Sequence, residues 1–439
     1  MFDFHTTRSL VLEANRSFEP LKWDGTERPS IHLEDVSGIP FVAGIAGVEE
    51  YQHRARVRAR DQDLFVSVSK AQPGYEDYCR WLGLGAPEHL VAEPVEEATR
   101  VTHACLKEEA YRSLLEWSRD QPSQHVLIHP YMAIDEVWAL AQKLSADGVK
   151  PQVVGPPPAV LWLANDKATL TALVAETLGE SWVPKTAHAF SADALSELLK
   201  DFAKNFDFVG LKRTRCASAM GNRVFDSQEV SNLSDQARLA LVQEFLDDTE
   251  WDGREEILVV EWLVSDDSPS TQTWIPPLGK GQPRLDGVYE QLLVGVEKMF
   301  LGSQPSTLPA DLNSAIGEAS FKVATALQEL GYVGRCSFDF VVGQDGRPRF
   351  TECNGRWGGT STPMHLMDRL FDERPHYVAQ DWVEPSLVGK SFKELHQALE
   401  PKLYNPRTQE GHFILYNVGP ITEKGKFDII SMNGQKPVF

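Results

Sequence analysis

Residues 331–359, GYVGRCSFDFVVGQDGRPRFTECNGRWGG, carry the strongest structural signal in the chain. Two runs rich in Val and Phe flank the turn residues 343–346, and this pattern predicts a β-hairpin. Asp339 lies on the first predicted strand, and Glu352 and Asn354 lie on the second. Because side chains two residues apart share one face of a strand, Glu352 and Asn354 are expected on the same side. The hairpin thus groups oxygen-bearing side chains on a rigid pair of strands.

The two hairpin acids, Asp339 and Glu352, each lie within an apolar run. An acid in such a run is unfavourable unless something pairs with it. Carboxylate and amide oxygens are the ligands that Mg²⁺ prefers, so Asp339, Glu352 and Asn354 form a candidate metal site. Arg356 follows on the same side, where it could neutralise charge on a transferred phosphoryl group. The alternative is a surface hairpin whose carboxylates are solvated.

The chain has 439 residues, which is enough for two or three domains, and 42% of them are hydrophobic. The balance of 43 basic and 63 acidic residues gives a net charge of −20. This charge argues against nucleic acid or an anionic membrane as a partner, because the long-range field repels polyanions. A nucleotide site would therefore need its own cluster of Lys and Arg.

Targeting and redox signals are absent from the sequence. No apolar run approaches the roughly 20 residues of a membrane span, and the N-terminus lacks a signal-peptide pattern, so we expect a soluble cytoplasmic protein. Five cysteines without a C-x-x-C pair favour neither a disulfide framework nor a zinc site. Cys353 should point away from the metal face into the core, with a reactive nucleophile as the alternative.

Residues 1–155 alternate strand-like and helix-like segments, which predicts a small α/β layer with at least partly parallel strands. No G-x-G-x-x-G fingerprint occurs in this region. The segment 75–81 is read as a packed helix or, alternatively, a substrate-facing one. A proline-rich connector at 155–158 marks a domain boundary. The expected strands are 63–69, 125–130 and 152–155, and the expected helices are 108–118 and 135–144.

Two lysines follow the connector in contexts that suit phosphate binding. Lys167 opens an amphipathic helix over 168–178. Lys212 ends a strand over 208–212 and precedes a loop of small residues that includes Gly221. Backbone N–H groups of such a loop, together with a lysine, can bind a triphosphate. The alternative is a hairpin with a basic rim.

Several more helices, strands and loops are expected in the rest of the chain. The apolar segment 255–263 could offer an edge N–H and C=O to adenine. Residues 266–285 are rich in Pro, Gly and polar residues, which predicts a long surface loop that could act as a lid. Helices are expected at 235–246 and 311–330, and a strand at 413–418. The expected apolar face of the 311–330 helix consists of Ile316, Phe321, Val323, Leu327 and Leu330.

Taken in order, these motifs resemble those of ATP-grasp enzymes, such as biotin carboxylase and D-alanine:D-alanine ligase, over residues 160–385. The loop departs from the family pattern because it keeps only Gly221 of the usual glycines. The resemblance implies an α/β and α+β fold, with a Rossmann-like pre-ATP-grasp domain before a two-subdomain ATP-grasp fold. The implied parts are 1–158, 159–260, 261–385 and a C-terminal tail, 386–439, that packs on the core.

The resemblance also implies cofactors and site residues: ATP and Mg²⁺, with two ions expected and Mn²⁺ as an alternative. For Arg335 the implied role is pairing with the carboxylate of the donor substrate, and a structural salt bridge remains equally open. Residues 360–364 resemble a substrate-binding segment, with a helix N-cap as a compatible reading. The implied ATP contacts are Lys167, Lys212, Ser218, Ala219, Gly221, Val260, Glu261 and Leu263; the metal ligands are Asp339, Glu352 and Asn354; and the groups near the reacting atoms are Arg356 and Arg335.

The implied reaction is phosphorylation of a carboxylate by ATP, followed by attack of an amine, such as an amino acid or peptide, on the acyl phosphate. The layout looks most like the pheganomycin-type peptide ligases of natural-product assembly. The absence of a carrier domain with a Met-Lys-Met motif opposes carboxylation. A non-amine acceptor and a non-catalytic nucleotide-binding regulator remain alternatives. No motif fixes the oligomeric state, and a homodimer stays open.

Overall fold

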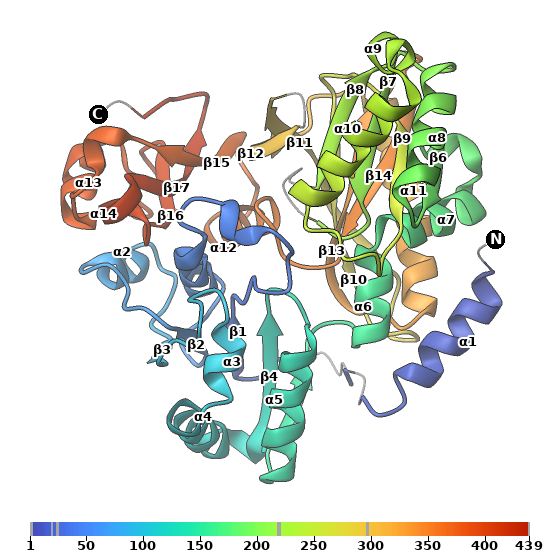
Figure 1. Cartoon of the computed structure of the whole chain (residues 1–439). Helices are drawn as coiled ribbons and strands as arrows, with labels where there is room; N and C mark the ends of the chain where they lie inside the picture. The colour runs from blue at the N-terminus through green and yellow to red at the C-terminus, as the bar shows by residue number, and fades with distance from the viewer. Residues whose placement is uncertain (1–2, 19–20, 23–25, 217–220, 296–297, 438–439) are drawn as a thin grey trace.

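The computed structural model describes residues 3–18, 21–22, 26–216, 221–295 and 298–437 (Figure 1). Three β-sheets organise these residues: a five-stranded, an eight-stranded and a four-stranded sheet. The first belongs to the N-terminal region at the bottom of Figure 1, and the four-stranded sheet forms the green lobe at the upper right. The mixed α/β architecture agrees with the predicted fold class.

The N-terminal sheet is fully parallel and has the order β3-β2-β1-β4-β5. Its strand order reverses between β1 and β4, so the carboxyl ends of these two strands flank the crevice where open α/β sheets bind ligands. The predicted alternation of strands and helices is confirmed here. The elements are α1 (Phe4–Ala14), β1 (Ser30–Leu33), β2 (Leu64–Ser67), α2 (Tyr75–Trp81), β3 (Glu88–Val91), α3 (Val101–Cys105), α4 (Glu108–Asp120), β4 (His125–Pro130), α5 (Asp135–Ala146) and β5 (Lys150–Val153).

The four-stranded sheet is antiparallel and has the order β6-β9-β7-β8. Helix α8 packs on β6, β7 and β9, and α10 packs on α8. This layer holds the predicted strand that ends near Lys212 and the predicted helix over 235–246. The elements are β6 (Thr186–Ala189), α8 (Ala192–Ala203), β7 (Phe208–Arg213), β8 (Asn222–Asp226), α9 (Ser227–Asn232), α10 (Asp235–Asp248) and β9 (Ile257–Glu261).

The eight-stranded sheet has the order β14-β13-β10-β11-β12-β15-β17-β16. Helix α7 packs on β14, and α11 packs on β10 and β11 and on α7. Strands β16 and β17 extend the sheet beyond β15, so C-terminal residues belong to the same sheet as the hairpin. The elements are α6 (Pro158–Asn165), α7 (Lys167–Leu178), β10 (Pro269–Ile275), β11 (Arg284–Val294), β12 (Met299–Pro305), α11 (Ala310–Glu329), β13 (Gly334–Val342), β14 (Pro348–Asn354), α12 (Ser361–Leu370), β15 (Tyr377–Val383), α13 (Phe392–Leu399), β16 (Phe413–Asn417), α14 (Ile421–Lys424) and β17 (Lys426–Met432).

Two predictions from the sequence are wrong in this sheet. The segment 266–285 is not one long loop, because β10 is a buried strand between β13 and β11. Its polar side chains are accommodated inside the protein, as when Thr271 Oγ1 lies 3.0 Å from Ser320 Oγ of α11. Phe321 lies on the outer side of α11 and is 41% exposed, whereas Val323 is fully buried. The helical repeat through Ile316 and Val323 therefore sets the buried face.

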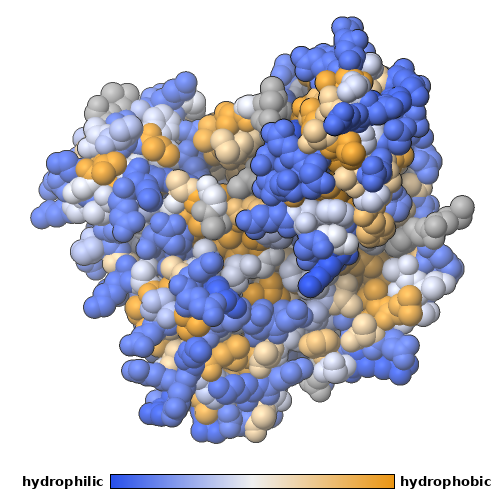
Figure 2. Space-filling view, viewed as in Figure 1, coloured by the Kyte–Doolittle hydropathy of each residue, from blue (hydrophilic) through white to orange (hydrophobic). Residues whose placement is uncertain are grey.

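Hydrophilic residues cover most of the face shown in Figure 2, and hydrophobic residues gather in the hollow between the left and upper-right lobes. Within the part of the chain that the structure describes, no helix combines the length and apolar character needed to cross a membrane.

Candidate active site

The hairpin of β13 and β14 brings the three predicted metal ligands together. In its register Asp339 is opposite Glu352, and Ser337 is opposite Asn354. Asn354 Nδ2 donates a hydrogen bond to Asp339 Oδ2 at 2.9 Å. Cys353 faces the other way and is buried in the core, as the strand alternation predicts. The hairpin therefore presents two carboxylates and one amide on the side away from the core.

The electrostatics of the two hairpin acids differ. Burial and the neighbouring Glu352 raise the pKa of Asp339 to about 7. Burial alone would raise the pKa of Glu352, but the Lys167 ammonium and two further cations lower it to about 2. Ser270 of β10, which pairs with Asp339, also hydrogen-bonds to that carboxyl group. A divalent cation would reduce the repulsion between the two carboxylates, so the oxygen-only donor set fits Mg²⁺.

The acids alone do not make a complete metal centre. Among the described residues, no group of three or more His, Cys, Asp or Glu side chains is placed to hold a metal ion. Mg²⁺ sites commonly use one or two carboxylates and take their other ligands from water and phosphate oxygens. Asp339 and Glu352 therefore suit a metal shared with a phosphate group better than a closed structural site.

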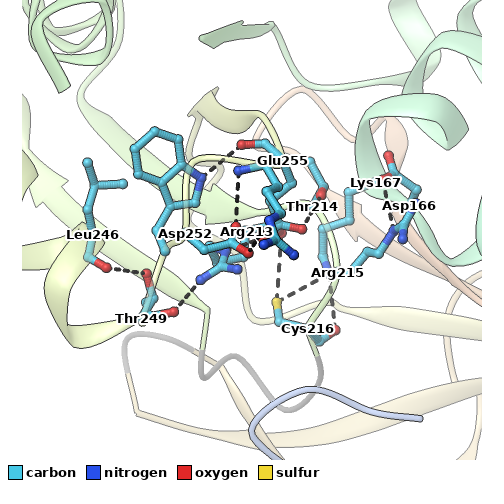
Figure 3. Close-up of polar contacts among 12 residues, drawn as sticks. Asp166, Lys167, Arg213, Thr214, Arg215, Cys216, Leu246, Thr249, Asp252 and Glu255 are labelled. Atoms are coloured by element: carbon cyan, nitrogen blue, oxygen red, sulfur yellow. Dashed lines mark hydrogen bonds and ion pairs between the residues drawn. The ribbon is translucent and has the colours of Figure 1, made fainter. Parts of the chain in front are cut away.

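Lys167 lies at the first position of α7 because Asp166 caps this helix and accepts a hydrogen bond from Thr169 N at 3.1 Å. Lys167 Nζ lies 2.9 Å from Glu352 Oε2. It also donates to Cys216 O at 3.2 Å, a contact that Figure 3 shows. Burial disfavours the charged amine, but Cys216 and Glu352 outweigh it, so the pKa of Lys167 lies above its ordinary value. The structure thus joins this lysine to the hairpin.

Lys212 belongs to β7 in the other lobe, and its Nζ lies 4.8 Å from the ring centre of Trp262. Burial and, to a smaller extent, the nearby Lys167 lower its pKa to about 8. Two close ammonium groups repel each other, so a polyanion between them would be stabilised. The structure therefore brings together two lysines that are 45 residues apart in the sequence.

The loop after β7 is described only at its two ends, and Ser218 and Ala219 lie outside the described residues. Gly221 O accepts a hydrogen bond from Arg213 N at 2.8 Å. A Cβ atom at Gly221 would lie 2.8 Å from Cys216 Cβ, so this position needs glycine. Figure 3 shows Arg213 beside Glu255 and Arg215 beside Asp166. The first contact joins the start of the loop to the chain before β9, and the second joins it to the cap of α7.

The predicted adenine-binding strand differs from expectation. β9 is an inner strand that pairs with β6 and β7, so Val260 has no free edge. Glu261 N donates to Lys185 O at 2.8 Å, and the Glu261 carboxylate accepts from Lys185 N at 3.2 Å. The prediction of an open edge along this strand is wrong. Leu263 lies beyond the end of β9 and is half-buried.

Arg356 is held by a residue that the sequence reasoning missed. Asn165, the last residue of α6, accepts a hydrogen bond from Arg356 Nη1 at 2.8 Å and one from Gly355 N at 3.1 Å. A Cβ atom at Gly355 would lie only 2.7 Å from Asn165 Nδ2, so glycine permits this close approach. In the sequence, the position of Asn165 next to Asp166 and Lys167 was the signal that could have identified it as a site residue.

Arg335 has a protein partner. Its Nη1 forms an ion pair with Asp286 of β11, and its guanidinium lies 5.4 Å from the ring centre of Trp357. Of the two roles left open by the sequence, the salt bridge is present. Ser361, in the segment that resembled a substrate-binding one, begins α12, and its hydroxyl accepts from Gly358 N at 2.6 Å.

Comparison with solved structures places this architecture. The chain is similar to N5-carboxyaminoimidazole synthetase from Staphylococcus aureus complexed with ADP, at 11% identity and a TM-score of 0.54 over 95% of each chain. It is also similar to the biotin carboxylase β-γ-ATP complex from Campylobacter jejuni, at 12% identity and a TM-score of 0.55 over 93% of this chain and 88% of that one. The chain has the ATP-grasp fold. No protein-family model and no curated protein matches the sequence.

In this ATP-grasp fold a small cavity joins the N-terminal sheet to the hairpin. It contains four predicted site residues, Lys167, Glu352, Asn354 and Arg356, whereas Lys212, Arg335 and Asp339 are not among its lining residues. Sequence reasoning missed the contribution of the N-terminal sheet. The strand-order reversal that places the ends of β1 and β4 at this crevice is seen only in the structure. The other lining residues are Gly38, Ile39, Pro40, Met132, Trp162, Asn165, Arg215, Cys216 and Cys353.

Proposed function

We propose that this protein is an ATP-dependent ligase that joins a carboxylate to an amine through an acyl phosphate. The observation that carries the proposal is the direct contact between Lys167 of α7 and Glu352 of the hairpin, 2.9 Å apart, with Arg356 and Asn354 lining the same cavity. This combination of phosphate-binding cations and Mg²⁺-type ligands occurs within an ATP-grasp fold. Structural neighbours solved with ADP or an ATP analogue support a nucleotide as the cosubstrate.

In this proposal ATP binds between the four-stranded sheet and the hairpin. Lys167 and Lys212 bind phosphate oxygens, together with the described end of the loop at Gly221. Ser218 and Ala219, the other expected contacts, lie outside the described residues. The adenine lies beyond the end of β9, where Glu261 O and Leu263 N can serve as acceptor and donor. We also retain the division 1–158, 159–260, 261–385 and 386–439 as the proposed domain arrangement.

Asp339, Glu352 and Asn354 would hold Mg²⁺, with Mn²⁺ as a second choice and two ions as the proposed number. When bound, the metal neutralises charge on the triphosphate and orients its terminal phosphate. Metal binding also requires Glu352 to share its carboxylate between Lys167 and the ion, which the low pKa of this group permits because it stays ionised. Intact oxygen ligands favour an enzyme over a nucleotide-binding regulator.

The chemistry follows from these positions. A carboxylate oxygen of the donor attacks the γ-phosphorus, and ADP leaves. The amine nitrogen of the acceptor then attacks the carbonyl carbon, the C–O bond to phosphate breaks, and the amine proton passes to solvent or phosphate. Arg356, fixed by Asn165, stabilises negative charge on the transferring phosphoryl group or on the tetrahedral adduct. We further propose that the amide is a peptide bond formed during the assembly of a natural product.

The experiment that tests this proposal screens pairs of carboxylates and amines for ADP release and for product mass. Amino acids and short peptides form the first panel. The proposal expects a pair for which ADP release depends on both substrates and for which an amide is detected. ATP binding without substrate-dependent ADP release across amine, thiol, hydroxyl and bicarbonate acceptors would contradict it and would favour the regulator.

A further inference from the structure

Trp357, the residue after Arg356, lies where the hairpin meets the N-terminal sheet. Its main-chain N–H donates to Tyr131 O at 2.9 Å, just after β4. The Arg58 guanidinium lies 4.5 Å from the Trp357 ring centre, and the Arg335 guanidinium lies 5.4 Å from it. Two arginines from different elements thus contact one indole, next to the proposed reaction centre and at the crevice of the parallel sheet.

Both arginines have buried donors that lack an acceptor. Arg58 is 3% exposed and bonds Glu34 through Nη2, yet its Nε and Nη1 find no partner among the described residues. Arg335 is 9% exposed and bonds Asp286 through Nη1, while its Nε is likewise without a partner in that part of the chain. Buried guanidinium N–H groups are normally satisfied, because leaving one unpaired is costly. These donors therefore indicate a missing acceptor.

The local charge also favours an anion. Asp286 is shared between Arg335 and Arg284, whose Nε lies 2.5 Å from it. Arg369 of α12 donates to the main-chain carbonyls of residues 57, 59 and 84 and, within the described chain, forms no ion pair. Burial first, and then Arg335, Arg369 and Arg58, hold the pKa of His365 well below its ordinary value. This positive excess occurs in a chain of net charge −20.

Open space lies beside Gly358, the residue after Trp357. Apart from its chain neighbours, no atom of the described residues lies within 4 Å of the point where a Cβ at Gly358 would be. The His365 ring meets the Trp357 indole edge-on, with 5.5 Å between ring centres. An indole face, open space and two planar guanidinium groups together suit a small organic anion, since guanidinium binds carboxylate with matched planar geometry.

We propose that Arg58 and Arg335 form a subsite for a substrate carboxylate that is not consumed in the reaction. This proposal rests on the proposed ligase function and adds the class of substrate. A carboxylate held beside Trp357 lies next to the reaction centre at Arg356, so it belongs either to an amine acceptor that is an amino acid or peptide, or to a donor with two carboxylates. In both cases the substrate carries a carboxylate that binds to this subsite and does not react.

Binding titrations of the full-length protein with ADP and Mg²⁺ test the subsite. One arm compares amino acids with the corresponding amino acid amides, and the other compares succinate and glutarate with butyrate and succinamate. Thermal shift and Trp fluorescence report binding, with Trp357→Phe identifying the fluorescence of Trp357. We expect carboxylates to bind at least 10-fold more tightly than their neutral counterparts in one arm, and that arm identifies the source of the carboxylate.

The variants are Arg58→Gln, Arg335→Gln and the control Arg60→Gln, whose side chain is 50% exposed. We expect the first two to weaken carboxylate binding about 10-fold or more and the control to change it little, with ADP affinity retained in all three. Because Arg58→Gln leaves Glu34 buried and unpaired, the double variant with Glu34→Gln removes both charges. Gly358→Val offers a further variant, since it fills the open space while both arginines remain.

The outcomes separate this proposal from the ligase function. Equal affinity for carboxylates and amides, no binding of any carboxylate, or normal binding by Arg58→Gln and Gly358→Val would overturn the subsite even if amide products form. Carboxylate binding that depends on Arg58 would establish the subsite even if ADP release is never observed.

Discussion

Asn165 Oδ1 lies 2.8 Å from Nη1 of Arg356 and holds that guanidinium at the end of α6. The same oxygen accepts the amide of Gly355 at 3.1 Å, so a single side chain fixes the end of the hairpin. Asn165 Nδ2 in turn donates to Leu161 O at 2.8 Å. Asn165 is therefore a positioning residue for Arg356, and its effect should be on the rate of the chemical step.

Replacing Asn165 with alanine should lower kcat about 10-fold or more, because a hydrogen bond to a charged group typically contributes about 1.5–3 kcal/mol. The KM for ATP should change much less, since Asn165 does not bind nucleotide in this account. Asn205→Ala is the matched control, because within the described chain the Asn205 side chain bonds only the neighbouring Asp201 O, on the surface. An unchanged kcat in Asn165→Ala would contradict the positioning role.

Glu352→Gln should reduce kcat by about 100-fold or more and raise the Mg²⁺ concentration needed for half-maximal rate. The amide cannot balance the charge of the metal, and it also leaves Lys167 without its carboxylate partner. Asn354→Ala should give the same pattern with the fold intact by circular dichroism. Glu108→Gln, at a side chain that is 90% exposed, serves as the control. Full activity of both site variants at saturating Mg²⁺ would remove the metal assignment.

Lys212 should make ATP affinity depend on pH. Its pKa is lowered to about 8, so the amine is cationic below that pH and neutral above it. Phosphate binding requires the cation, so Kd for ATP should rise roughly tenfold per pH unit above 8, as measured by calorimetry. Lys212→Arg should remove this dependence, and Lys212→Ala should raise the KM for ATP at every pH. A Kd that stays constant between pH 7 and 9.5 in the wild type would contradict the assignment.

The loop at 276–283, the part of the predicted lid that remains a loop, should not respond to nucleotide. It leaves β10 at Ile275, five residues beyond the Ser270 that faces Asp339, which places it roughly 17 Å away at about 3.4 Å per residue. Gln328 Nε2 donates to Pro276 O at 2.7 Å and to Gly281 O at 3.0 Å, which ties the loop to α11.

Tryptic cleavage at the exposed Lys280 should therefore proceed at the same rate with and without ATP and Mg²⁺. Gln328→Ala should accelerate it, because the loop loses its two hydrogen bonds. Strong protection by ATP would show that the loop closes over the site after all.

Locally encoded elements were predictable from the sequence. The strand at 125–130 coincides with β4, and the hairpin around Asp339 and Glu352 was found because its apolar runs and turn residues agree. β10 was missed because Ser270 to Thr273 read as polar loop residues, whereas they are 3% exposed or less. Their hydroxyl and amide groups are placed by the neighbouring strands and by α11, and no local pattern records that environment.

Contacts between residues that are far apart in the sequence also could not be predicted. Asn165 and Arg356 are 191 positions apart, and a single sequence contains nothing that pairs them. The same holds for Arg58 and Trp357, which meet only because the hairpin docks on the carboxyl end of β4. The order of the ATP-grasp motifs could still be recognised, because each motif depends on a short stretch of chain.

The most direct test of the ligase mechanism follows oxygen from the donor carboxylate. With a productive pair from the screen and a donor labelled with ¹⁸O in both carboxylate oxygens, an acyl phosphate must transfer one donor oxygen to the phosphate it releases. We predict inorganic phosphate carrying one ¹⁸O for each amide formed, measured by mass spectrometry. Label found in AMP, or phosphate that carries no ¹⁸O while amide forms, would contradict the acyl-phosphate account.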